Sequence, residues 1–247
     1  MLNSQVFKQS NNQIIFASIV PHPPILLPEV GSPQDRTQVK ETIKSLEKLG
    51  EKLKTVNPDS IIISSPHPDW GIKVPLYFLL SDQKSKLEFK IQNYQSPDKV
   101  IIGSDKVIIE SEKKIIYPIL TNLDSPSQHF EWGKKFYSLI SKKFKDQKLA
   151  LIASGDLSHC LKENGPYGFH PDGPKFDKSL IEYLTRKDIE NILKLEKVYP
   201  GAGECGLRSF SFLLGILEVS KIDWKTEILS YEGPFGVGYL VINFKLN

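Results

Sequence analysis

Two histidines of the chain lie in the same local pattern, between two prolines at the end of an apolar run. His22 follows the run at 14–20, and His67 follows the run at 61–65. Proline fixes its own φ and keeps the residue before it extended, so each imidazole hangs from a stiff backbone. Neutral imidazole is a common ligand of transition metals. The pattern therefore predicts that His22 and His67 bind a metal ion.

A third histidine follows another apolar run. Residues 149–153 read as a buried strand, and Ser154-Gly155-Asp156-Leu157-Ser158-His159 comes directly after it. A histidine near a metal, held by a carboxylate and titrating around neutrality, suits general acid/base work on a bound hydroxyl or carbonyl. We expect His159 to be that catalytic group and Asp156 to orient it. In the alternative reading, Asp156 caps a helix and His159 is an ordinary polar residue.

A carboxylate and a thiol stand side by side in the segment Gly201-Ala202-Gly203-Glu204-Cys205-Gly206. Glu204 would complete the two-histidine, one-carboxylate set of non-haem Fe(II) oxygenases, whereas Cys205 would favour Zn. Glu204 could instead complement the dipole of the helix that follows. The third ligand stays open between Glu204 and Cys205. The segment also fits G-x-G-x-x-G, but no convincing strand precedes it, so we expect no dinucleotide site.

The two remaining histidines are weaker candidates. His129 stands at the start of a predicted helix, and we expect it to pack or to lie on the surface. His170 lies in the turn-rich stretch 165–173, which suits a lid or the rim of a pocket. Neither is expected to bind the metal.

The elements that must position these residues alternate between strand and helix. After the first strand, Ser32 and Pro33 form a good helix start, and apolar residues recur at helical spacing up to Asn57. The strand at 61–65 follows. This βαβ order predicts parallel neighbouring strands, whose carboxyl ends form the edge where open α/β sheets bind ligands.

The rest of the chain adds both kinds of element. Further strands are predicted at 76–80, 87–94, 99–102, 107–110, 227–231 and 237–244, and helices at 130–145, 176–184, 187–195 and 204–219. We expect one α/β domain over residues 1–247, with a flexible start at 1–12 and a mixed, mostly parallel sheet flanked by helices on both faces.

Composition narrows the class of protein. The 247 residues are 40% hydrophobic and 25% charged, as in ordinary globular proteins. Basic and acidic residues number 32 and 29 and are interspersed, so nucleic acid is not an expected partner. No apolar run is long enough to span a bilayer, no secretory signal is seen, and two cysteines favour a reducing compartment, the cytoplasm by default. A small molecule is the expected substrate, and a homo-oligomer is left open.

Taken in order, the motifs resemble a known family. They are Pro-His-Pro-Pro after the first strand, Ser-Pro-His after the second, Ser-Gly-Asp-Leu-Ser-His, Gly-Pro-Tyr-Gly-Phe and Gly-Glu-Cys-Gly-Leu-Arg. The chain resembles the class III extradiol ring-cleavage dioxygenase (LigB-like) superfamily, closest to its AmmeMemoRadiSam-system and Memo members. The resemblance implies metal ligation by His22 and His67, with Glu204 or Cys205 at the remaining position. It implies that His159 is the acid/base or a third ligand.

The function that the resemblance implies is that of an Fe(II)-dependent, extradiol dioxygenase-like oxidoreductase acting on a catechol-type substrate, with Zn or Cu as alternative metals. Extradiol dioxygenases of the family use a carboxylate as third ligand, whereas the Memo branch has cysteine. A Memo-like protein with other redox or hydrolytic chemistry, or a non-catalytic binding protein, is therefore the alternative. Many members carry Asp-His-Gly where this chain has Trp70-Gly71 before Val74, which makes metal binding a firmer expectation than ring cleavage.

Overall fold

The computed structural model describes residues 13–80, 107–109 and 114–247. Its strands are β1 (Ile14–Val20), β2 (Ser60–Ser65), β3 (Val107–Ile109), β4 (Lys114–Leu120), β5 (Leu149–Ser154), β6 (Trp224–Glu232) and β7 (Tyr239–Leu246). Its helices are η1 (Pro24–Leu26), α1 (Pro33–Gln38), α2 (Lys40–Val56), α3 (Trp70–Leu79), α4 (Pro126–Lys143), α5 (Asp172–Arg186), α6 (Ile189–Ile192), α7 (Leu195–Val198) and α8 (Leu207–Ser220).

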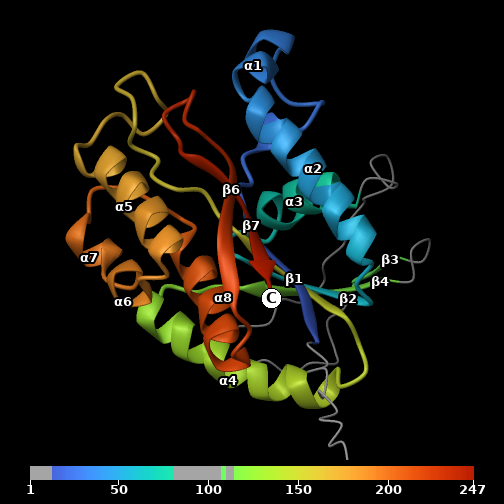
Figure 1. The fold of residues 1–247 in the computed structure, drawn as a ribbon. Coiled ribbons are helices and arrows are strands. Elements are labelled where there is room, and N and C mark those ends of the chain that lie inside the picture. Colours follow the sequence, from blue (N-terminus) through green and yellow to red (C-terminus); the bar gives the residue numbers. More distant parts are fainter. Residues whose placement is uncertain (1–12, 81–106, 110–113) are drawn as a thin grey trace, which may run out of the picture.

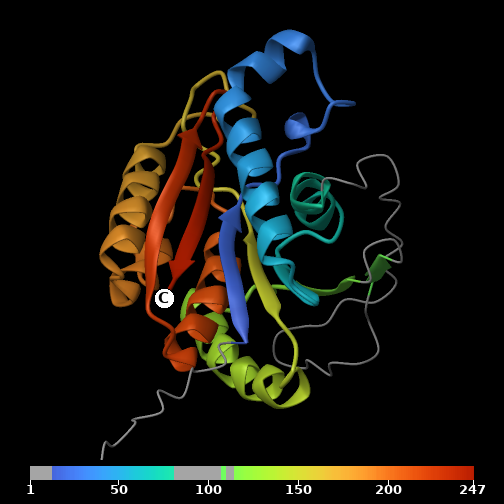
Figure 2. The same cartoon turned by 45° about the vertical axis from the view of Figure 1, so that its right-hand side comes forward.

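The strands form one mixed sheet in the order β3-β4-β2-β5-β1-β7-β6 (Figure 1). Strands β4, β2, β5 and β1 are parallel, while β3 and β7 run antiparallel to their neighbours β4 and β1, and β6 runs antiparallel to β7. Figure 2 shows α2 and α3 on the side of the sheet away from α4 and α8. The predicted α/β class, with a mixed sheet covered on both faces, is confirmed.

The central strands are apolar throughout because both faces of the sheet are covered. In β2, Ile61 and Ile63 pack with residues of α2 and α3, whereas Ile62 packs with residues of α4, α5 and α8. In β5 the same alternation holds, with Leu151 on the α4 and α8 side and Ile152 on the other. Two cores therefore hold the strands that lead to the histidines.

The register of the parallel strands brings their carboxyl ends to one level. Val20 pairs with Ser154, and Ser64 pairs with Ala153. The segments that follow β1, β2 and β5 consequently leave the sheet from the same edge. This is the edge at which the βαβ pattern predicts ligand binding.

The predicted start of the first helix is confirmed by its cap. The Ser32 hydroxyl accepts a hydrogen bond from the Asp35 backbone N–H (3.2 Å), and the Asp35 carboxylate accepts one from the Ser32 N–H (2.9 Å). The predicted helix is divided at Val39, whose ψ of 19° departs from helical values, into α1 and α2. It ends at Asn57 in the left-handed region, as the sequence indicates.

One predicted strand is wrong. Residues 76–80 fall on α3 and its end instead of forming a strand. Helix α3 is buried on most of its surface, with Ile72, Val74, Leu76 and Phe78 all inside, so it has no polar face to reveal a helical period. The strand predicted at 107–110 is present as β3, and β4 was not predicted. The segments 87–94, 99–102 and 1–12 lie outside the described residues.

All four helices predicted after residue 120 have different limits in the structure. Those predicted at 130–145 and 176–184 are present as α4 and α5, which each begin four residues earlier. The helix predicted at 187–195 is instead two short helices, α6 and α7. The helix predicted at 204–219 begins only at Leu207, because Gly203 has a φ of +64° and Gly206 caps the first turn. Glu204 and Cys205 therefore lie in the loop before α8. None of the helices in the described ranges is long and apolar enough to cross a membrane.

Candidate metal centre

His22 leaves the end of β1 and is fixed by three neighbours. Its side chain is almost fully buried, with the residue 4% exposed. The backbone N–H donates to Asp156 Oδ1 (3.0 Å), ring Nδ1 lies 2.9 Å from Ser154 Oγ, and ring Nε2 lies 3.6 Å from Cys205 Sγ. Burial, and to a lesser extent the neighbouring His67, lowers the pKa of His22 to about 3. The ring is therefore neutral at pH 7 and has a lone pair to offer a metal.

His67 follows β2 and faces His22 edge-on. The two ring centroids are 5.1 Å apart with an interplanar angle of 81°. Ser65 Oγ accepts from the His67 N–H (3.2 Å) and donates to the His67 carbonyl (3.0 Å), which fixes the turn. A Cβ on Gly71 would lie only 1.9 Å from Ser65 Oγ, so α3 can pack against this turn only with glycine there.

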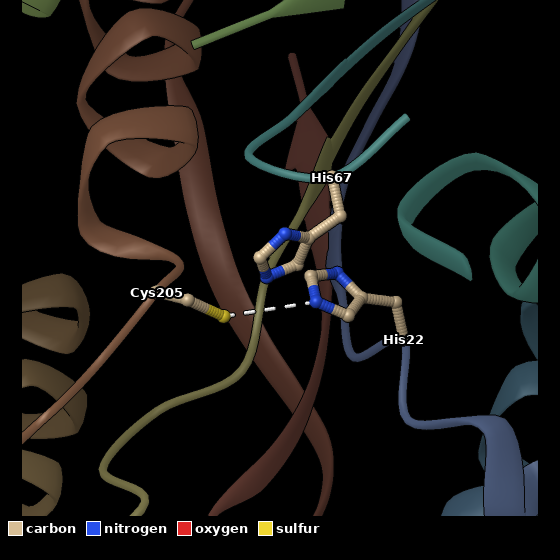
Figure 3. Close-up of side chains that lie close together, drawn as sticks. All are labelled: His22, His67 and Cys205. Atoms are coloured by element: carbon tan, nitrogen blue, oxygen red, sulfur yellow. Dashed lines mark hydrogen bonds between the residues drawn. The ribbon is translucent and has the colours of Figure 1, made fainter. Parts of the chain in front are cut away.

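Cys205 completes a triad with the two histidines. The donor atoms of His22, His67 and Cys205 all lie within 4.8 Å of one another, and Figure 3 shows the thiol directed at the rings. A Cβ on Gly155 would lie 2.2 Å from Gly206 Cα, so the two loops can meet because both lack side chains. Burial raises the pKa of Cys205 well above its ordinary value. The thiol keeps its proton at pH 7 unless a cation displaces it.

Glu204, the other candidate for the third ligand, is turned away from the histidines. Its Oε2 accepts a hydrogen bond from the Leu207 N–H at 2.6 Å, and its Oε1 lies 3.6 Å from the Arg208 guanidinium. Burial raises its pKa to about 7. The carboxylate thus satisfies an N–H in the first turn of α8, where the helix dipole favours negative charge. The structure brings Cys205, and not Glu204, to His22 and His67.

Asp156 and His159 lie close to the triad. Together with Cys205 they form a second group whose donor atoms lie within 4.8 Å of one another. Burial raises the pKa of Asp156 to about 6 and lowers that of His159, an effect that Asp156 partly opposes. Nε2 of His159 is buried and, among the described residues, is left without a hydrogen-bond partner.

Tyr167 covers His159 from the outside. The two ring centroids are 4.9 Å apart with an interplanar angle of 37°, and Tyr167 is 64% exposed. The tyrosine belongs to the Gly-Pro-Tyr-Gly-Phe motif, in the turn-rich stretch 165–173 that the sequence predicts to form a lid or the rim of a pocket. The Tyr167 ring thus lies between His159 and the protein surface.

The other two histidines lie outside these groups. His129 is fully buried in α4, where Nε2 accepts from the Asn122 N–H (3.4 Å) and the ring packs edge-on against Trp132. This agrees with the expectation of packing. His170 is exposed and packs against Gly201, where a Cβ would lie 2.1 Å from the ring.

Sequence reasoning missed the groups that hold the Asp156–His159 loop. Asp177 on α5 accepts from the Ser158 N–H (2.8 Å) and from the Tyr231 hydroxyl (2.6 Å). Ser158 Oγ donates to the Ala202 carbonyl at 2.7 Å, which ties this loop to the one that carries Cys205. The available signal was the pair of serines flanking Asp156 in the Ser-Gly-Asp-Leu-Ser motif, because serine often bonds to nearby backbone.

The donor set suits a transition metal. Two imidazole nitrogens and one sulfur are ligands that Zn, Cu and Fe accept. Nε2 of His22, which lies 3.6 Å from Cys205 Sγ, and the unpartnered Nε2 of His159 belong to two donor groups that share Cys205. The residues therefore fit a bound transition-metal ion.

Comparisons with known proteins point to one family. A family model described as the catalytic LigB subunit of aromatic ring-opening dioxygenase matches residues 67–242. Protein CA_C1420 of Clostridium acetobutylicum is 32% identical over 275 residues, which cover 92% of this chain and 56% of that protein. This chain thus spans little more than half the length of that relative.

A solved structure has the same fold. It is an uncharacterized protein, JW3007 from Escherichia coli K12, with 16% sequence identity and a TM-score of 0.50, and the match covers 92% of this chain and 98% of that one. Since the family model matches well over half of the residues, the chain belongs to the LigB family of aromatic ring-opening dioxygenase catalytic subunits.

Proposed function

We propose that this chain is a metal-dependent oxidoreductase that binds one Fe(II) ion through His22, His67 and Cys205 and acts on a catechol-type small molecule. The observation that carries the proposal is the convergence of these three donors, from three separate loops, to within 4.8 Å at the ligand-binding edge of the sheet. Membership of the LigB family supports a dioxygenase-like catalytic role.

The bound metal, His159 and Asp156 would each have a separate role in the reaction. Fe(II), when bound, would supply redox chemistry towards O₂ and the positive charge that lowers the pKa of a phenolic hydroxyl. His159 would take the proton of that hydroxyl at Nε2, which is buried and free of protein partners among the described residues. The Asp156 carboxylate beside it would favour the charged imidazole that results. Burial lowers the pKa of His159, so the ring is neutral and ready to accept a proton at pH 7.

A second candidate follows from the identity of the third donor. The third donor near the two histidines is the sulfur of Cys205, whereas the extradiol dioxygenases that this chain resembles use a carboxylate. A soft thiolate favours Zn or Cu. Such an ion would support the alternative, a Memo-like protein with another redox or hydrolytic chemistry in the same pocket.

Metal analysis and oxygen uptake test the proposal together. The protein is purified anaerobically without chelators, its metal content is measured, and the apoprotein is reconstituted separately with Fe(II), Zn(II) and Cu(II). We expect one ion per chain and oxygen uptake with at least one diol of a catechol panel only after Fe(II) loading. Stoichiometric binding with no oxygen uptake on any diol would overturn the dioxygenase assignment, and stoichiometric Zn or Cu in the isolated protein would favour the second candidate.

Variants separate the acid/base from the metal ligands. His159→Gln should keep the bound ion but lower kcat by about 10²–10⁴-fold, the usual contribution of a general acid or base. His170→Gln is the matched control, because this histidine is exposed and outside both groups. Normal turnover in His159→Gln would remove the proposed role of His159.

A further inference from the structure

The carbonyl of Gly71 lacks its usual hydrogen-bond donor. In an α-helix the N–H of the residue four positions later donates to each carbonyl, and here that residue is Pro75, which has no N–H. Ser154 Oγ, at the end of β5, lies 2.6 Å from the Gly71 oxygen. Because a carbonyl can only accept, Ser154 must be the donor. Pro75 thus leaves a carbonyl at the start of α3 that Ser154 satisfies.

This contact fixes the direction of the next hydrogen bond. A serine hydroxyl has one proton, and that proton is directed to Gly71. His22 Nδ1 lies 2.9 Å from the same oxygen, so Nδ1 must carry a proton and donate it. A neutral imidazole has only one N–H. Nε2 of His22 is therefore the bare nitrogen.

The other neighbours of His22 agree with this tautomer. Cys205 Sγ is 3.6 Å from Nε2, a distance at which a thiol can donate its hydrogen to a bare ring nitrogen. Asp156 Oδ2 is 3.9 Å from Nε2, too far to stabilise a proton there through a hydrogen bond, and Asp156 Oδ1 accepts the backbone N–H of His22 instead. The chain of donors thus runs from Cys205 through His22 and Ser154 to Gly71.

We propose that Ser154 is a positioning residue that holds His22 in the Nδ1–H tautomer and thereby directs the lone pair of Nε2 to the cation. Metal-bound histidines commonly donate their other N–H to a neighbouring acceptor, which fixes the tautomer and the ring orientation. The role towards a cation rests on the proposed metal centre. The tautomer itself rests only on the hydrogen bonds of this chain.

The tautomer can be measured in the metal-free protein. Long-range ¹H–¹⁵N correlation spectra of histidine-labelled protein at neutral pH distinguish protonated from bare ring nitrogens, and His22→Ala identifies the signals of His22. We expect a protonated Nδ1 and a bare Nε2 in the wild type, and a population with protonated Nε2 in Ser154→Ala. A protonated Nε2 in the wild type, or an unchanged tautomer in Ser154→Ala, would overturn the proposal.

Ser18→Ala is the matched control. Ser18 lies on the neighbouring strand β1, is fully buried as Ser154 is, and its hydroxyl has no hydrogen-bond partner among the described residues. It removes the same atom from a similar environment without touching His22. We expect this variant to keep the tautomer of the wild type, so that loss of a buried hydroxyl alone cannot account for a change in Ser154→Ala.

Metal affinity provides a second readout. In a chelator competition with Zn(II), Ser154→Ala should bind about 10–100-fold more weakly, the usual effect of removing a group that orients a ligand, and Ser18→Ala should bind as the wild type does. Equal affinities of Ser154→Ala and the wild type would overturn the positioning role. If the wild type binds no metal, the proposed function fails, while the spectra still decide the tautomer.

Discussion

The two sides of the candidate site are built differently. One side, the fixed wall, consists of His22, Ser154 and Asp156, which are all buried and joined by hydrogen bonds. The other side, the open wall, consists of His67, His159 and Tyr167, which are partly or largely exposed. Their contacts within the site are mainly ring contacts, between His67 and His22 and between His159 and Tyr167. One wall is held in place by hydrogen bonds, and the other is more open to solvent.

The difference shows that one sequence pattern can serve two environments. His22 and His67 both stand between prolines after a buried strand. The chain after His22 enters η1, whose Leu26 is buried in the core, whereas the chain after His67 passes through an exposed turn into α3. The segment that follows each histidine, and not the Pro-His-Pro pattern, determines its burial.

The largest difference between substitutions in the fixed wall and in the open wall should be in metal binding. His22→Ala removes a buried donor, and the space it leaves is closed off by Ser154 and Asp156, so we expect no stoichiometric binding of Zn(II) or Fe(II). His67→Ala removes an exposed donor that water can replace, so we expect weaker but measurable binding. Isothermal titration calorimetry of both variants is the measurement. Equal losses would show that the two walls do not differ.

A smaller effect, on stability, concerns Asp177, the buried acid that accepts a hydrogen bond from Ser158 in the loop that carries Asp156. Burial raises the pKa of Asp177 to about 7, so between about pH 4 and pH 7 the folded state binds more protons than the unfolded state. The free energy of unfolding should therefore fall by a few kcal/mol as the pH rises through this range. Asp177→Asn, whose amide can still bond to Ser158 and Tyr231, should flatten this dependence in urea titrations.

Asp223→Asn is the control for that experiment. Asp223 is exposed, and its pKa is lowered by hydrogen bonds from Lys187 and Asn247. Its contribution to stability is present above the unfolded pKa and lost only at lower pH, so its removal should leave the dependence above about pH 4 unchanged. If the free energy of unfolding had the same pH dependence in Asp177→Asn and in the wild type, Asp177 would not have the raised pKa expected of a buried acid.

A third effect concerns Gly71 at the start of α3, which contacts Ser154 of the fixed wall and His67 of the open wall. In Gly71→Ala the new methyl group would lie 1.9 Å from Ser65 Oγ and 3.2 Å from His67 Cβ, so α3 must shift. We expect a loss of about 1–3 kcal/mol in the free energy of unfolding, as for other overpacked sites. Denaturant unfolding measures it. A change below about 0.5 kcal/mol, typical of open surface positions, would mean that this contact is loose.

The smallest effect should come from Tyr167 in the open wall. Tyr167→Ala should change the free energy of unfolding by less than about 0.5 kcal/mol, because the side chain is largely exposed. The KM for a diol substrate should nevertheless rise, and Tyr167→Phe should restore it by replacing the ring over His159. A large loss of stability in Tyr167→Ala, or an unchanged KM, would contradict the prediction that Tyr167 contributes to substrate binding and not to folding.

The sequence predicted much of the fold because local patterns determine it. Apolar, β-branched runs predict β1, β2 and β5, and the Ser32-Pro33 start predicts the cap of α1. Helix α3 could not be predicted, since burial on most sides removes the polar face that reveals a helical period. Such a helix has the same composition as a buried strand.

The arrangement of the site was less accessible to sequence reasoning. Glu204 and Cys205 are neighbours in the chain, and which of them faces the histidines depends on the left-handed Gly203 and on where α8 begins. The contact of Ser154 with Gly71 joins residues 83 positions apart and needs the missing N–H of Pro75. Long-range packing decides both, and no local motif reports it.

The central claim, that Cys205 is the third metal ligand beside His22 and His67, is tested most directly by titration with Co(II). Cobalt bound to a thiolate gives a sulfur-to-metal charge-transfer band in the near ultraviolet. We expect this band in the wild type and in Glu204→Gln, and its loss in Cys205→Ser. Stoichiometric Co(II) binding without the band, or loss of binding in Glu204→Gln with the band retained in Cys205→Ser, would contradict the account.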